Sequence, residues 1–262
     1  MNKPIGNPVQ MCEVFHLEFL RWFARKLEAD HYVLKGGVNL RLFFKSIRYS
    51  EDMDIDVKGA RVERIKKTVM DILTARGFTG SLKSFGIERI VAPDLTKAKQ
   101  TETTQRFKIH LLTTGGEDLF TKVEFSRRGL KGFQIVEPVS GEILRAYKMA
   151  PLLVPHYDAA SAVAQKIQAL AQRTVLQARD IFDLFVLSSQ YEGAGRDKIQ
   201  VSAVVLKTAL DNIFLVEFPR FRDTVVAYLG AEDQKAYSSP EIWDEIKLKT
   251  AHFLDEFKHE NK

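Results

Sequence analysis

The pattern of apolar and polar positions predicts a mixed helix-and-strand segment followed by a purely helical one. Apolar residues recur at helical spacing over residues 9–29 and 61–76, and Gly77 is expected to end the second of these helices. Period-two alternation and β-branched or aromatic runs predict strands at 31–35, 52–58, 84–91, 105–113, 119–126 and 132–137. After Ser140 only helical patterns remain, at 140–147, 158–173, 177–189, 200–213, 219–229 and 240–258. We therefore predict an α/β N-terminal lobe with a mixed β-sheet over residues 1–138 and an all-helical C-terminal lobe over residues 139–262.

The most informative stretch lies between residues 32 and 57. A short apolar run meets the glycine pair Gly36-Gly37, a helical segment follows, and three aspartates then alternate with apolar residues. These aspartates are Asp52, Asp54 and Asp56. Alternation places the three carboxylates on one face of a strand, where they repel unless they face water or share a divalent cation. A glycine turn that opens a helix lets the backbone approach phosphate closely. The plain alternatives are a tight turn and a solvated strand face, but the combined order is typical of nucleotidyltransferases that bind a metal–triphosphate.

A further carboxylate lies in the strand predicted at 119–126. Glu124 stands between Val123 and Phe125, which point to the opposite face of that strand. On a strand adjacent to the aspartates, Glu124 can ligate a second metal ion or act as base toward an attacking hydroxyl. An ordinary surface glutamate is the alternative.

The helical segment carries a third group of charged residues. Lys166 and Arg173 share a helix face, and Arg179 and Asp183 are spaced i, i+4. From spacing alone we favour a surface ion pair between Arg179 and Asp183. The functional alternative makes Lys166 a phosphate-binding cation with Asp183 or Asp180 as its positioning partner.

Composition and charge restrict the protein classes. The 262 residues carry a net charge of +5, so a polyanionic partner is plausible. Basic clusters that can meet RNA phosphates or remain solvated are Lys97, Lys99, Arg106, Lys108, Arg127, Arg128 and Lys131. The single cysteine, Cys12, excludes an intramolecular disulfide and argues against a cysteine-based zinc site. No apolar run is long enough to span a membrane, and no secretory signal is evident, so we expect a cytoplasmic protein without a membrane partner.

Four stretches together resemble the AbiEii/AbiGii nucleotidyltransferase toxin family, a branch of the DNA polymerase β-like superfamily. They are VLKGG at 33–37, RYSEDMD at 48–54, KVE at 122–124, and Lys166 with RDIFD at 179–183. The resemblance covers about residues 30–190. Its first motifs are shared with many nucleotidyltransferases, whereas the RYSED and RDIFD forms narrow it to this family.

The resemblance implies a two-lobed toxin that uses a nucleoside triphosphate and Mg²⁺ or Mn²⁺. Some members transfer nucleotides to the acceptor end of tRNA, and some pair with a separately encoded antitoxin. By motif position, Asp52 and Asp54 are the metal-binding pair, with Asp56 as a substitute if the register is shifted. Ser50 becomes a phosphate contact, and Lys166 and Asp183 become site residues. The family usually has Thr or Ser where this chain has Val38, which removes a hydroxyl contact to the triphosphate.

These observations lead to one predicted reaction and two alternatives. We predict metal-dependent transfer of a nucleotide from an NTP to an RNA acceptor, with tRNA as the expected acceptor. Gly36 and Gly37 shape the phosphate turn, Asp52, Asp54 and Glu124 bind metal, and Lys166 contacts the triphosphate. The alternatives are nucleotidylation of a protein hydroxyl and a catalytically silent protein that binds nucleotide or a partner.

Overall fold

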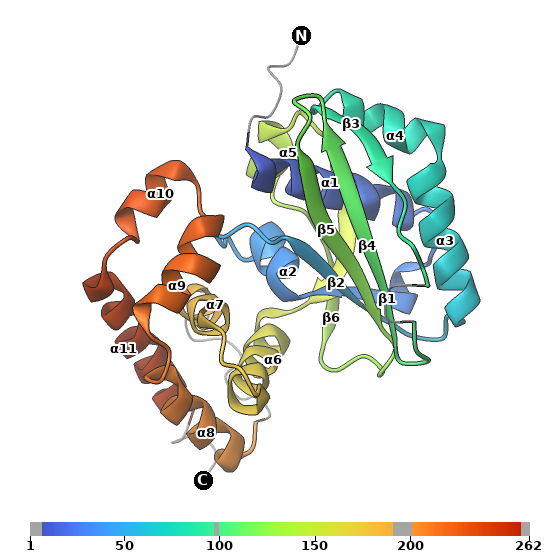
Figure 1. The fold of residues 1–262 in the computed structure, drawn as a ribbon. Helices are drawn as coiled ribbons and strands as arrows, with labels where there is room; N and C mark the ends of the chain where they lie inside the picture. The colour runs from blue at the N-terminus through green and yellow to red at the C-terminus, as the bar shows by residue number, and fades with distance from the viewer. Residues whose placement is uncertain (1–6, 97–99, 191–200, 258–262) are drawn as a thin grey trace. The chain divides into compact units, whose positions relative to one another are not determined.

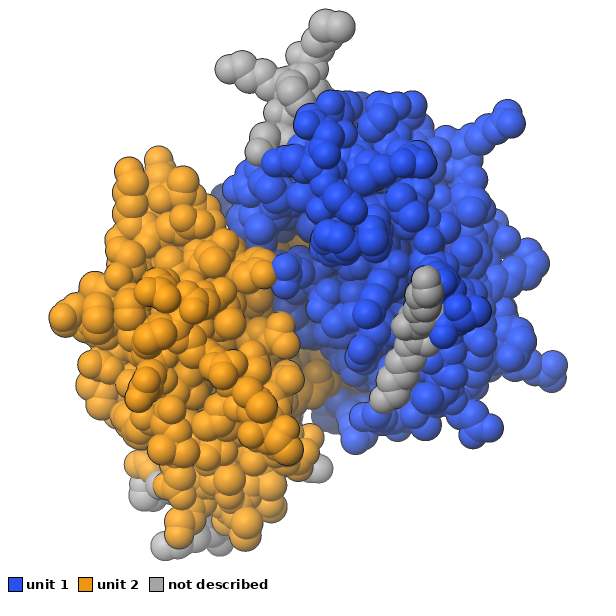
Figure 2. Space-filling view, viewed as in Figure 1, with its two compact units in different colours: residues 1–39, 49–156 blue, residues 40–48, 157–262 orange. Residues whose placement is uncertain are grey.

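The computed structural model describes residues 7–96, 100–190 and 201–257, and its chain forms two compact units (Figure 2). Unit 1 comprises residues 1–39 and 49–156, and unit 2 comprises residues 40–48 and 157–262. The chain therefore changes unit after residues 39, 48 and 156, whereas the sequence predicted one lobe boundary after residue 138. The predicted sites Lys97 and Lys99 lie outside the described residues.

Within the described residues, unit 1 is built on a seven-stranded mixed sheet with strand order β3-β4-β5-β2-β1-β7-β6 (Figure 1). The strands are β1 (Tyr32–Lys35), β2 (Asp52–Val57), β3 (Ile87–Val91), β4 (Thr104–Thr113), β5 (Asp118–Ser126), β6 (Gln134–Pro138) and β7 (Leu153–Tyr157). Strand β2 pairs antiparallel with β1 and parallel with β5, and β1 pairs parallel with β7. The antiparallel pairs β3–β4 and β4–β5 complete one side. The predicted mixed sheet is confirmed.

One face of this sheet is covered by helices. Besides the 3₁₀ turn at Ala29–His31, the helical elements are α1 (Pro8–Phe23), α3 (Val62–Thr74), α4 (Arg76–Lys83) and α5 (Gly141–Ala146), and α2 (Gly36–Phe43) begins in unit 1 and ends in unit 2. Phe23 of α1 packs on Phe125 of β5 with ring centroids 5.3 Å apart, and Phe15 packs on Phe78 of α4 at 5.9 Å. In Figure 1, α1 lies behind β4 and β5, so the opposite face of these strands points to the viewer.

Unit 2 is helical after β7 in the part of the chain that is described. Its elements are α6 (Ala159–Gln172), α7 (Ala178–Ser188), α8 (Ala203–Ile213), α9 (Phe218–Thr224), a 3₁₀ turn (Val226–Tyr228), α10 (Ala231–Ala236) and α11 (Pro240–Glu256). Trp243 stacks on Phe221 at 4.3 Å and donates its indole N–H to the Val216 carbonyl at 2.8 Å. Among the described helices, none combines the length and apolar character needed to cross a bilayer.

Strand β7 corrects the expectation that residues after Ser140 are only helical. Residues 154–157 are buried, and His156 lies opposite Leu34 of β1. The local signal is poor because Pro155 supplies no backbone N–H and because a strand buried on both faces does not alternate. Pairing within the sheet, between β1 and β6, therefore specifies this strand.

The expected end of a helix at Gly77 is also wrong. Helix α3 ends at Thr74, Ala75 is extended, and α4 then begins at Arg76 and contains Gly77. A Cβ on Gly77 would lie 3.1 Å from the Trp22 ring, so this glycine allows α4 to pack closely on α1. The first helix ends at Phe23 rather than at 29, and α10 was not predicted.

Candidate active site

Strand β2 presents its three aspartates on one face, as the alternation predicts. Met53 and Ile55 are fully buried on the opposite face. Asp52 and Asp54 are partly exposed, whereas Asp56 is only 4% exposed. The carboxylates therefore become more buried toward the end of the strand, and Asp52 and Asp54 are the pair that a ligand can reach.

The strand order places Asp54 between a lysine and a glutamate. Lys35 of β1 lies opposite Asp54 on one side, and Glu124 of β5 lies opposite it on the other. Arg106 of β4 follows in the same row, opposite Glu124. The predicted adjacency of Glu124 to the aspartate strand is thus present, although β3 and β4 separate the two strands in sequence.

Three of the four carboxylates on this face have a cation as partner. Lys122 Nζ lies 2.6 Å from an Asp52 oxygen, and Lys35 Nζ lies 2.5 Å from an Asp56 oxygen. Arg106 donates to Glu124 Oε2 from both Nε, at 2.8 Å, and Nη2, at 2.7 Å. In the part of the chain that the structure describes, no ion pair forms to the Asp54 carboxylate.

Burial raises the pKa of Asp54 above its ordinary value of 3.8. Lys35 and Lys122 act in the opposite direction, whereas the negative charges of Glu124 and Asp52 add to the rise. The charged form of Asp54 is thus destabilised by its partly desolvated position, and a cation bound beside it would relieve this.

The glycine turn lies directly against this carboxylate. Gly36 has φ +71°, and a Cβ there would lie 2.9 Å from Asp54 Oδ2. Only glycine combines that backbone conformation with that approach. The glycine pair and the aspartate strand, which the sequence placed in one motif, are therefore neighbours in space as well.

The predicted phosphate contact Ser50 has its side chain engaged within the fold, and so does Val38, where the sequence indicated a missing contact. The Ser50 hydroxyl donates its hydrogen to the Asp52 carbonyl oxygen at 2.8 Å, so it supports the start of β2. A hydroxyl has one hydrogen, so a phosphate contact requires Ser50 to rotate. Val38, which follows the glycine pair, is 3% exposed and packs in the interior.

The donor chemistry of this face fits a divalent cation. Carboxylate oxygens are the ligands that Mg²⁺ and Mn²⁺ prefer, and Asp52 and Glu124 flank Asp54 on the same face. Among the described residues, the three carboxylates do not gather within 4.8 Å of one another. The two outer carboxylates are instead paired with Lys122 and Arg106. Metal binding has to compete with these two pairs.

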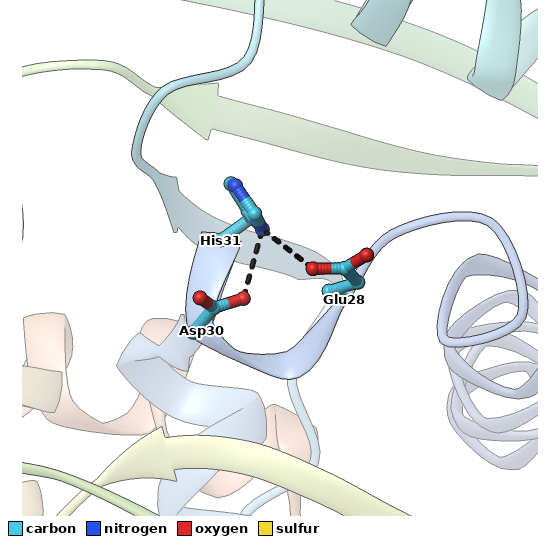
Figure 3. Close-up of side chains that lie close together, drawn as sticks. All are labelled: Glu28, Asp30 and His31. Carbon is cyan, nitrogen blue, oxygen red and sulfur yellow. Dashed lines mark ion pairs between the residues drawn. The ribbon is translucent and has the colours of Figure 1, made fainter.

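The described residues do contain one compact group of potential metal ligands, at the turn before β1. It consists of Glu28, Asp30 and His31, which lie close together in Figure 3. His31 Nδ1 lies 2.8 Å from Asp30 and 3.8 Å from Glu28, whose side chains are 72% and 84% exposed. Exposed ion pairs explain this arrangement, and it shares no residue with the carboxylate face of β2.

Lys166 and Asp183 come together in unit 2, in a charge network with Arg48, Asp180 and Arg173 that is buried except at Arg173, whose side chain is 40% exposed. Lys166 Nζ of α6 lies 2.6 Å from Asp183 and 3.0 Å from Asp180, both on α7 and both fully buried. Arg48 Nη2 contacts the two Asp183 oxygens at 3.0 and 3.1 Å, and Arg173 Nε lies 2.7 Å from Asp180. The surface pair Arg179–Asp183 that spacing favoured is wrong, because Asp183 faces the interior and pairs with Arg48 and Lys166.

Opposing effects determine the ionisation of this network. Burial lowers the pKa of Lys166, but Asp183 and Asp180 outweigh it, and the net pKa lies above 10.5. Burial raises the pKa of Asp183, but Arg48 and Lys166 outweigh it, and the net pKa lies below 3.8. Both residues are therefore charged at neutral pH.

Arg48 is the residue whose role the sequence did not indicate. It appeared only as the first letter of the RYSED motif, yet it is 5% exposed and bound to a carboxylate 135 positions away. Its position immediately before Tyr49 and Ser50 was the available signal. The role of Arg106 was also not predicted, because the sequence showed this residue only as part of a basic cluster. The available signal was the buried Phe107 beside it, since neighbouring residues of a strand point to opposite faces of the sheet.

Comparisons with known proteins identify the family and the fold of this chain. The model of the AbiEii family, described as nucleotidyl transferase AbiEii toxin of type IV toxin–antitoxin systems, matches residues 18–259. A search among curated proteins found no match. MenT4, a nucleotidyltransferase toxin from Mycobacterium tuberculosis, superposes with a TM-score of 0.60 and 18% identity, over 95% of this chain and 84% of that one. JHP933 from Helicobacter pylori gives a TM-score of 0.52 and 17% identity, over 98% and 94% of the two chains. These two structures show the fold, and the family match extends over nearly the whole chain. The chain therefore belongs to the AbiEii family of nucleotidyltransferase toxins.

Proposed function

We propose that this nucleotidyltransferase transfers a nucleotide from an NTP to an RNA acceptor in a metal-dependent reaction, and that the acceptor is tRNA. The observation that carries the proposal is the position of Asp54. It lies beside Gly36, in one row with Lys35 and Glu124, and burial raises its pKa. Such a carboxylate favours a bound cation, and the adjacent glycine turn favours phosphate.

In this proposal Asp52 and Asp54 hold Mg²⁺ or Mn²⁺, and Glu124 completes the metal site. The bound ion would neutralise triphosphate charge and make the α-phosphate more susceptible to attack. Glu124 keeps Oε1 outside the ion pair with Arg106, and this oxygen is available to accept the proton of the attacking hydroxyl. Gly36 and Gly37 bring the backbone close to the phosphates.

The roles of the helical residues are the less direct part of the proposal. We retain the division into a catalytic lobe and an all-helical lobe, and the helical content of unit 2 supports it. The assignment of Lys166 to the triphosphate remains a prediction, because its ammonium group already contacts Asp180 and Asp183. If Lys166 binds phosphate, Lys166→Ala weakens NTP binding about 10- to 100-fold and Lys166→Arg restores it only in part. Unchanged NTP affinity in both variants would leave Lys166 with a structural role alone.

The proposed partners follow from the reaction. Because the proposed substrates are an NTP and RNA, we expect the protein to act in the cytoplasm. Because the family belongs to toxin–antitoxin systems, we also expect a separately encoded antitoxin as a partner. The net charge of +5 is in the direction that an RNA acceptor requires.

The test is a transfer assay with each α-labelled NTP, Mg²⁺ and total tRNA. We expect label on RNA with the wild-type protein and none with Asp52→Ala/Asp54→Ala. Label on protein instead of RNA would identify a protein hydroxyl as the acceptor. Absence of transfer with every NTP, together with retained nucleotide binding, would indicate a silent binding protein.

A further inference from the structure

A row of exposed side chains crosses strands β3, β4 and β5 on the same sheet face as the carboxylates. Val91, His110 and Phe120 lie opposite one another in the strand register. Phe120 is 61% exposed and Val91 is 39% exposed. The rings of His110 and Phe120 are 4.3 Å apart between centroids at an interplanar angle of 63°. The strand face thus presents an aromatic pair to solvent.

This row continues into the candidate active site. Phe120 and Glu124 are four residues apart on β5, which corresponds to about 13 Å at the usual rise per residue of a strand. The row between them contains Lys108, Lys122 and Asp52, which lie opposite one another on β4, β5 and β2. Along this face, the aromatic row (Val91, His110 and Phe120) is followed by the lysine row (Lys108, Lys122 and Asp52). The carboxylate row, which contains Asp54 and Glu124, comes next.

The lysine row carries an unbalanced charge. Lys108 and Lys122 are directly opposite, an arrangement that destabilises a strand pair unless an anion lies nearby. Lys122 is bound to Asp52, whereas Lys108 is exposed and forms no ion pair among the described residues. Beyond the aromatic row, Arg89 is exposed, and Asp118 lies 3.3 Å from His110. These two rows together hold three cations and two carboxylates, and both carboxylates have partners, Asp52 with Lys122 and Asp118 with His110.

The combination is typical of a surface that binds single-stranded nucleic acid. Bases stack on exposed aromatic rings, and neighbouring lysines or arginines contact the phosphates. A cross-strand pair that only stabilises the hairpin contributes a few tenths of a kcal/mol and does not require a ring that is mostly exposed. A protein partner is less favoured because the row beside the aromatic pair is cationic rather than apolar.

We propose that the face formed by Phe120, His110 and Lys108 binds the acceptor RNA upstream of its reacting end. A base stacks on Phe120 and His110, and a phosphate contacts Lys108. The inference rests on the proposed RNA acceptor. At about 3.4 Å per stacked nucleotide, the 13 Å between Phe120 and Glu124 corresponds to about four nucleotides.

The first experiment measures RNA binding, which is independent of nucleotide transfer. The probes are a labelled single-stranded 12-nucleotide RNA and a blunt duplex of the same length, and the readout is fluorescence anisotropy. Phe120→Ala should weaken binding of the single strand about tenfold and that of the duplex much less, because duplex bases are already stacked. Phe120→Trp should restore binding. The matched control is Phe133→Ala, because Phe133 is 64% exposed next to β6, at the other end of the strand order.

The salt dependence of binding tests Lys108 separately. Lys108→Ala should reduce the slope of log K against log salt by about 0.7, the value for one phosphate contact on a single strand. Lys67→Ala is the control, because Lys67 is 76% exposed on α3, which does not belong to this face. Its slope should equal that of the wild type.

The second experiment uses transfer to acceptors of different length. Phe120→Ala should lower kcat/KM for a 12-nucleotide acceptor and leave a trinucleotide acceptor unaffected, since three nucleotides do not reach Phe120. Equal losses for both lengths, an effect equal to that of Phe133→Ala, or no RNA binding by the wild type would overturn the inference. Loss of binding to a protein partner with unchanged RNA affinity would also overturn it. If the wild type transfers nucleotide to RNA but Phe120→Ala has no effect, only the proposed RNA-binding surface is refuted. If RNA binding depends on Phe120 but no transfer occurs, only the proposed reaction is refuted.

Discussion

Removal of the Asp183 carboxylate provides a direct test of the buried charge network in unit 2. Both oxygens are in use: Arg48 contacts them at 3.0 and 3.1 Å, and Lys166 contacts one at 2.6 Å. The Asp183 and Arg48 side chains are 0% and 6% exposed, so water does not replace the lost partner. Asp183→Ala therefore leaves two cations without this carboxylate.

The expected cost follows from which cation keeps a partner. Lys166 retains Asp180 at 3.0 Å, so the main loss is the pair with Arg48. Breaking one buried ion pair costs about 3–5 kcal/mol. With a slope of about 2 kcal/mol per molar urea, the unfolding midpoint should fall by about 2 M.

The assay requires a signal from unit 2 alone. The two tryptophans of the chain lie in different units, Trp22 in α1 and Trp243 in α11. Urea unfolding followed by fluorescence in a Trp22→Phe background therefore reports on the surroundings of Trp243. Asp223→Ala is the control, because Asp223 is 61% exposed beside Arg222 and should change stability by less than about 0.5 kcal/mol.

Two further measurements distinguish the ion pair from lost packing. Asp183→Leu combined with Arg48→Met removes both charges and should cost less than Asp183→Ala alone. Because the pKa of Asp183 lies below 3.8 in the folded state, its stabilisation is complete above that pH and is lost as the pH falls through the lower folded-state value. A free energy of unfolding for Asp183→Ala within about 0.5 kcal/mol of the wild-type value at pH 7 would refute the reasoning.

Three other predictions concern unit 1. Asp54→Asn should lower turnover at least about 10²–10³-fold yet raise the unfolding temperature at pH 7, because it removes a desolvated charge. The gain should begin to shrink as the pH falls below the raised folded-state pKa of Asp54 and should vanish near the ordinary value of 3.8, and an unfolding temperature below wild type at pH 7 would contradict the electrostatic argument. Gly36→Ala should cost about 1–3 kcal/mol in thermal unfolding, whereas Gly80→Ala, with open space around it, should be neutral or stabilising; equal effects would contradict the close approach to Asp54. Burial raises the pKa of the Cys12 thiol to about 12, so Ellman's reagent should react only after unfolding, and rapid native labelling would contradict this.

Local patterns in the sequence determined much of unit 1. The alternation of Asp52, Met53, Asp54 and Ile55 was sufficient to place the carboxylates on one face, because the period of a strand is a property of its backbone. The glycine pair marked the turn for a similar reason, since positive φ is a local requirement that only glycine meets cheaply. These inferences needed no knowledge of the neighbouring strands.

Contacts between distant segments could not be inferred in this way. The row of Lys35, Asp54, Glu124 and Arg106 depends on β5 pairing with β2 rather than with β6, its successor in sequence. The same holds for β7, whose residues show little local strand signal and are specified by pairing with β1. Strand order is a property of the whole sheet, and periodicity carries no information about it.

The largest difference between sequence and structure concerns buried charge. Spacing alone assigned Asp183 to a helix surface, because i, i+4 pairs with arginine are common there. In the structure Asp183 faces inward and binds Arg48, 135 residues earlier in the chain. A carboxylate looks the same in sequence whether it is solvated or buried. The sequence by itself determined the face of strand β2, the glycine turn and the family motifs, whereas the tertiary structure decided the strand order, which charges are desolvated and which partners stabilise them.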